Sequence, residues 1–249
     1  AFVPPEGSRI MCNQTYVSAH LIAIGRKDFF PCYDMSDVVK AVDVLRVRKI
    51  LKSLHIFFPL KDSMLSFGAQ SSYISLDHIR QRFGCRFTHM NAEQIFNAID
   101  ELTEEEKQEC EQMAKEIVSS AEETHMPLEN TIKDCIFFGA LKKLMAQRDC
   151  NAFTIPCFEV CATRELNKRQ FTFCLGKSLL REEGIPSACA GDVGAILTNA
   201  LLMAVCNASP HMGNTMVWER ANNICRLQQD SPTRYMKGYD KPMMPYNIV

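Results

Sequence analysis

The sequence predicts an α/β fold, in which layers of parallel sheet are flanked by helices and the start of a β-rich domain follows at the C-terminus. Two observations lead to this prediction. Short apolar runs alternate with runs that repeat apolar residues at helical spacing, and this order of strands and helices is typical of α/β proteins. After Pro210 the chain turns to short alternating segments, which are typical of strands.

The N-terminal part leads into the predicted α/β domain. Residues 1–36 contain three prolines and a short apolar run that ends at Gly25, and we interpret them as the end of a preceding α/β region. A helical pattern begins at Ser36-Asp37, with its apolar residues on one side. Residues 50–60 are then expected to form a buried strand that ends near Pro59.

Capping residues mark the helix ends in the middle of the chain. Gly84 ends a short amphipathic helix over residues 76–83, and a strand is expected over residues 85–89. Thr103 and Glu106 form a capping box, in which each side chain bonds to the backbone N–H of the other residue. The helices expected next cover residues 92–102, 104–123 and 129–148.

The same alternation continues in the second half of the chain. Strands are expected over residues 151–160 and 187–189, and helices over residues 174–183 and 193–206. Taken together, the elements predict an α/β domain over residues 37–209 and the start of a C-terminal β-rich domain over residues 210–249.

The composition is that of a soluble globular protein and narrows the range of partners. Of the 249 residues, 47% are hydrophobic and 23% are charged, and the net charge is −1. This balance gives no reason to expect a nucleic-acid or membrane partner. The longest apolar run is far shorter than the ~20 residues of a membrane-spanning helix. Twelve cysteines without a Cys-x-x-Cys pair argue against zinc or cluster sites and indicate a reducing cytoplasm.

Two carboxylates follow predicted strands, at the edge of the sheet where α/β proteins bind their ligands. Glu159 follows a buried apolar strand, so its carboxylate must be paired, hydrated or shifted in pKa. Asp192 either caps the helix over residues 193–206 or points into the crevice as an acid, a base or a metal ligand. We predict Asp192 and Glu159 as the catalytic or ligand-holding carboxylates.

Two further side chains near this edge are candidates. Cys189 precedes the Gly191-Asp192 turn and is the one cysteine that we consider as a nucleophile, although no histidine lies near it in the sequence. His211 follows Pro210 in a loop, where it is either a polar surface residue or a contact to substrate. The sequence contains no Gly-rich phosphate-binding loop.

Four segments carry a resemblance to a known family. The most specific is residues 183–198, which read EGIPSACAGDVGAILT. It is supported by residues 151–159 (NAFTIPCFE), 211–214 (HMGN) and 231–240 (SPTRYMKGYD). Together these segments resemble the L-fucose/L-arabinose isomerase superfamily, in its fucose-isomerase-like branch. The resemblance covers about residues 130–249 and is loose before them, and it implies that the chain is the central part of a longer protein.

The resemblance implies an aldose–ketose isomerase that works through an enediol, with Mn²⁺ held by carboxylates and a histidine, and that assembles as a homo-oligomer. It assigns His211, Asn214 and Cys189 to contacts with the substrate. The sequence departs from the family pattern at the metal. Ala190 stands in place of a glutamate, Asn214 in place of an acid, and Gln229 in the stretch where a histidine is expected. These side chains are poor ligands for a hard cation or none at all.

The leading hypothesis is therefore a protein of carbohydrate metabolism that isomerises a small sugar or polyol with Asp192 and Glu159. The alternative is a non-catalytic or metal-independent sugar-binding relative of the isomerase fold. A third hypothesis is a different carbon–carbon or redox activity on the same scaffold, because a fold does not fix a function.

Overall fold

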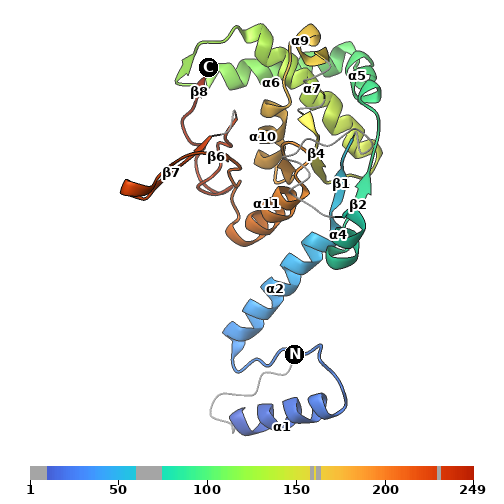
Figure 1. Cartoon of the computed structure of the whole chain (residues 1–249), viewed down its shortest axis with the longest axis vertical. Helices are drawn as coiled ribbons and strands as arrows, with labels where there is room; N and C mark the ends of the chain where they lie inside the picture. Colours follow the sequence, from blue (N-terminus) through green and yellow to red (C-terminus); the bar gives the residue numbers. More distant parts are fainter. Residues whose placement is uncertain (1–9, 60–74, 158–159, 161–163, 229–230) are drawn as a thin grey trace. The chain divides into compact units, whose positions relative to one another are not determined.

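The structure is a computed structural model, shown in Figure 1, and it describes residues 10–59, 75–157, 160, 164–228 and 231–249. The chain divides into two compact units, Ala1–Ile50 and Leu51–Val249. The first unit contains helix α1 (Ile10–Ala23) and all but the last turn of α2 (Met35–Ser53). No helix in the described part of the chain is both long and apolar enough to cross a membrane. The domain boundaries expected at residues 36/37 and 209/210 stay predictions.

The second unit is built on a sheet of four parallel strands in the order β2-β1-β4-β5. The sheet confirms the predicted α/β class with a parallel sheet flanked by helices. Its strands are each two or three residues long. They are β1 (His55–Phe57), β2 (Arg86–Thr88), β4 (Ala152–Thr154) and β5 (Ser187–Ala188).

Helices cover both faces of this sheet. Side chains of a strand alternate between faces, so Phe57 and Phe153 lie in one core cluster while Ile56 and Ala152 lie in another. The first cluster is completed by α5 (Ala92–Asp100), α6 (Glu104–Ser119), α7 (Leu128–Gln147) and α10 (Cys174–Glu182). The second is completed by α4 (Leu76–Phe83) and α11 (Val193–Cys206). Coverage of both faces is the usual arrangement of a parallel sheet.

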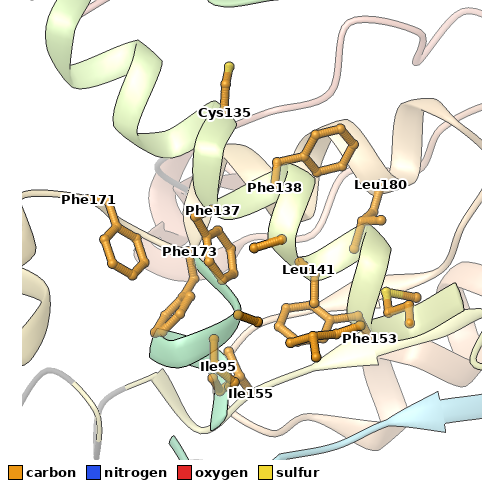
Figure 2. Packing of buried hydrophobic residues seen from close by; sticks show 14 of the residues in the cluster. Ile95, Cys135, Phe137, Phe138, Leu141, Phe153, Ile155, Phe171, Phe173 and Leu180 are labelled. Atoms are coloured by element: carbon orange, nitrogen blue, oxygen red, sulfur yellow. The ribbon is translucent and has the colours of Figure 1, made fainter. Parts of the chain in front are cut away.

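Aromatic side chains fill the larger core cluster. Figure 2 shows Phe137, Phe138 and Leu141 of α7 among Phe153 and Ile155. The ring of Phe137 is fully buried, and its centroid lies 5.2 Å from that of Phe171 and 5.0 Å from that of Phe173. Helix α10 packs against the same ring, because a Cβ atom added to Gly176 would lie 3.0 Å from Phe137. The core thereby fixes α10 beside the sheet.

The remaining elements lie outside this sheet. Strands β6 (Asn214–Glu219) and β7 (Ile224–Gln228) lie in the region where strands were expected after Pro210. They form an antiparallel hairpin joined by the short helix η1 (Arg220–Asn222). Strand β3 (Glu123–Thr124) pairs in parallel with β8 (Asn247–Ile248) and so ties the C-terminus to the segment after α6. A short helix, α9 (Glu165–Arg169), precedes α10.

Two predicted strands and one predicted helix differ from the structure, and one helix was missed. The helix predicted over residues 104–123 ends at Ser119, and Glu123 belongs to strand β3. Residues 50–53 end helix α2 instead of starting a strand, and β4 ends at Thr154 instead of continuing to Val160. Short apolar runs fit a buried strand and a buried helix equally well, so periodicity could not place these ends. Helix α1 was not predicted, because residues 10–23 have no continuous apolar stripe.

Candidate functional site

A cleft of about 850 Å³ lies beyond the carboxyl ends of β4 and β5. Crevices at this edge of a parallel sheet are the usual ligand sites of doubly wound proteins. Its walls come from the loops after the two strands, the first turns of α7 and α10, and the β6–β7 hairpin. The described residues that line it are Met126, Asn130, Asp134, Cys157, Leu166, Asn167, Gln170–Cys174, Cys189, Ala190, Asp192, Met212, Asn214, Met216 and Gln228.

Strand pairing brings Cys157 and Cys189 to the same place. The register aligns Thr154 with Ala188, so the next residue on each strand begins the loop at the cleft. The Ile155 carbonyl oxygen accepts hydrogen bonds from the N–H groups of Cys157 (2.8 Å) and Gly191 (3.0 Å). The loops that follow β4 and β5 therefore fold over one carbonyl group.

A cation and three thiols meet at the floor of the cleft. Lys177 Nζ donates a hydrogen bond to Cys189 Sγ, and the thiols of Cys157 and Cys174 also contact that sulfur. Cys174, Lys177 and Arg181 share one face of α10, because residues three and four apart lie above one another on a helix. Lys177 is only 3% exposed. The packing of α10 on the core thus holds a buried ammonium group against Cys189.

This arrangement favours the thiolate form of Cys189. A buried ammonium is unfavourable without a counter-charge, and the Cys189 sulfur is the partner that the structure describes for Lys177. Hydrogen bonds from Cys157 and Cys174, together with Lys177, lower the pKa of Cys189 well below that of a free thiol. The contact with Cys189, together with burial, raises the pKa of Cys157, so this thiol stays protonated. The sulfurs also raise the pKa of Lys177 although burial opposes them.

Asp134 is the second titratable group of the cleft. Its carboxylate accepts hydrogen bonds from the backbone N–H of Thr172 at 2.8 Å and from the Thr172 hydroxyl at 3.3 Å. Burial nevertheless raises the pKa of Asp134 to about 6. A carboxyl group with such a pKa exchanges its proton close to neutral pH, which is what acid/base chemistry requires.

Asp192 is a helix cap that also lines the cleft, and its role as an acid, a base or a metal ligand stays a prediction. Its carboxylate accepts a hydrogen bond from the Ala195 N–H at 2.8 Å and so caps helix α11, and the same residue lines the cleft. The other predicted carboxylate, Glu159, lies outside the described residues. The predicted pair of Asp192 and Glu159 therefore stays a prediction.

The residues assigned to substrate contacts fall in two places. Cys189 and Asn214 line the cleft. His211 is exposed and is not among the described residues that line it. Partial burial and the nearby Arg181 lower the pKa of His211, which favours its neutral form.

The described residues do not fit the Mn²⁺ site that the resemblance implies. Ala190 offers no ligand atom, Asn214 offers a neutral oxygen, and Gln229 lies outside the described residues. Within the described part of the chain, no group of three histidine, cysteine or acidic side chains is placed to hold a metal ion.

Sequence reasoning missed the cleft residues that come from helices. Asp134 looked like one polar residue of an amphipathic helix, and its place depends on how α7 packs. Lys177 and Arg181 do not line the cleft, but they left a usable signal in the sequence, because they fall at helical spacing after Cys174 and so share its helix face. Both are nearly fully buried in the structure. A lysine and an arginine on the core-facing side of a short helix predict a buried partner of opposite charge.

Comparison with known proteins finds no family model that matches the chain and no matching curated protein. The resemblance to sugar isomerases therefore stays a prediction. The chemistry of the cleft is the basis on which a function can be argued.

Proposed function

We propose that the chain binds a small neutral sugar or polyol in the cleft at the ends of β4 and β5. The observation that carries the proposal is the chemistry of the lining. It combines two carboxylates, Asp134 and Asp192, with the amides of Asn130, Asn167, Gln170, Asn214 and Gln228. An amide offers a donor and an acceptor side by side, and a carboxylate offers two acceptors, so both can bond to neighbouring hydroxyl groups.

The charge of the lining favours a neutral ligand over a phosphorylated one. Among the described residues that line the cleft there is no lysine or arginine, whereas there are two carboxylates. A phosphate group carries roughly two negative charges, and the two carboxylates of the lining would repel them. Lys177 lies behind Cys189, and its charge is balanced by the thiolate. Neutral hydroxyl groups are not repelled by the two carboxylates.

A calorimetric titration with neutral pentoses, hexoses and their polyols tests this proposal. We expect saturable binding of at least one of them, and binding of its phosphorylated form at least about tenfold weaker. Asn130→Ala and Asn214→Ala should each raise the Kd about tenfold, because the loss of one hydrogen bond to the ligand costs about 1.4 kcal/mol. Asn97→Ala is the matched control, since Asn97 is an exposed amide outside the lining.

Two results would contradict the proposal. One is that no neutral sugar or polyol binds while a phosphorylated sugar does. The other is that both cleft variants bind as well as Asn97→Ala does. Because the described lining does not fit Mn²⁺, we also expect the Kd to stay the same after treatment with EDTA.

Aldose–ketose isomerisation is a second candidate function, and Asp134 is the observation that favours it. Isomerisation through an enediol needs a group that takes a proton from one carbon and returns it to the next. The Asp192 carboxylate is engaged in capping α11, whereas Asp134 has a pKa near neutrality within the same cleft. Incorporation of solvent deuterium next to the carbonyl carbon, followed by NMR, separates isomerisation from binding alone.

A further inference from the structure

We propose that Cys189 and Cys157 form a reversible disulfide when the protein meets hydrogen peroxide or an organic hydroperoxide. The cleft would then contain a site of oxidative modification in addition to its ligand site. This inference is independent of the proposed function, because it needs the sulfur cluster and no sugar.

The first argument is the state of Cys189. A thiolate, not a thiol, attacks the O–O bond of a peroxide, and cations beside a cysteine favour the thiolate. Lys177 holds its ammonium group against Cys189, and the packing of α10 on the core fixes Lys177. Cys189 is half-buried and lines the cleft of about 850 Å³, so a small peroxide can reach it.

The second argument is a protonated thiol in contact with Cys189. The side chains of Cys157 and Cys189 are hydrogen-bonded to each other. Their loops start from neighbouring strands and fold over the Ile155 carbonyl. The contact between the two sulfurs places them within reach of a disulfide bond. Cys174 also contacts Cys189, but it is held on helix α10.

The reaction proceeds in two steps. In the first, Cys189 thiolate attacks one peroxide oxygen, an S–O bond forms, the O–O bond breaks, and the sulfur becomes a sulfenic acid. The leaving hydroxide takes a proton from Lys177, which has lost its counter-charge, and becomes water. In the second step, the neutral Lys177 amine takes the Cys157 proton, the Cys157 thiolate attacks the Cys189 sulfur, the S–S bond forms, and the hydroxyl group leaves as water with that proton. The two sulfurs have supplied the two electrons that reduce the peroxide.

Mass spectrometry of the full chain tests the proposal. The reduced protein is treated with one equivalent of hydrogen peroxide, blocked with iodoacetamide and digested without reductant. We expect a peptide linked through Cys157 and Cys189 that dithiothreitol separates. In Cys157→Ser, dimedone should trap a sulfenic acid at Cys189. Cys206→Ser is the matched control, because Cys206 is exposed and outside the lining, and it should still form the bond.

The rate of oxidation distinguishes an activated thiolate from a merely accessible cysteine. Lys177→Met should slow the oxidation of Cys189 at pH 6 by at least about tenfold, because the cation that favours the thiolate is gone. If this variant does not fold, the pH dependence of the wild-type protein is decisive. The oxidation rate of its Cys189 should change less than about twofold between pH 6 and pH 8. A rate that rises about tenfold per pH unit, or a linkage of Cys189 to Cys174 instead of Cys157, would overturn the proposal.

Discussion

Replacing Asp134 by asparagine is expected to lower the kcat of the proposed aldose–ketose isomerisation by about 10²–10⁴-fold, the usual contribution of a general acid or base. Asparagine keeps an oxygen that can accept the hydrogen bond from the Thr172 N–H, so the cleft should keep its shape. The Kd of the sugar should change less than about tenfold. The measurement is deuterium incorporation and product formation under saturating substrate.

The pH dependence of the same assay gives a second readout. A carboxylate base is active when it is deprotonated, and the pKa of Asp134 is about 6. The wild-type kcat should therefore rise as the pH passes through about 6 and become constant above it, whereas Asp134→Asn should lack this step. Asp77→Asn is the control, because Asp77 is exposed and pairs with Arg80 on the surface. Wild-type kcat in Asp134→Asn would exclude Asp134 as the base.

Replacing Phe137 by alanine should lower the free energy of unfolding by about 3–5 kcal/mol, the usual cost of removing a buried aromatic ring. The ring is fully buried and contacts Phe171, Phe173 and the backbone of α10 at Gly176. Chemical denaturation followed by circular dichroism measures the change. Because Phe171 and Phe173 also line the cleft, the variant should bind sugar more weakly as well.

An exposed phenylalanine of the same unit provides the comparison. Phe83 ends helix α4 and is 38% exposed, so Phe83→Ala should cost less than about 1.5 kcal/mol. Equal losses for Phe137→Ala and Phe83→Ala would show that the aromatic cluster does not hold the core together.

Local signals predicted those parts of the fold that local interactions determine. Helix α4 ends at Gly84, whose φ of 79° suits glycine, and α6 begins with the capping box of Thr103 and Glu106. Both were predicted because such bonds involve residues close in sequence. The ends of β1 and β4 were not, because they depend on which strands pair. Pairing is a long-range interaction that one sequence does not reveal.

The candidate site also contains residues that local patterns predict and residues that only the packing of the fold brings to it. Asp192, Cys189 and Asn214 could be proposed because they follow predicted elements at one edge of the sheet. Asp134 could not, because it belongs to helix α7 and reaches the cleft only through the packing of that helix. Lys177 left only its place on the face of α10 that carries Cys174. Burial raises the pKa of the Asp134 carboxyl group and places the Lys177 ammonium group beside a thiol. This burial depends on the fold and cannot be read from the sequence.

Protection of Cys189 by ligand tests the central claim most directly, because that claim places the sugar site and the thiolate in one cleft. The rate of Cys189 alkylation by iodoacetamide is measured at increasing concentrations of the sugar or polyol that binds in the titration. We expect the rate to fall, with half-protection at the calorimetric Kd. An alkylation rate that stays constant at saturating ligand would contradict the claim, because the ligand would then bind elsewhere.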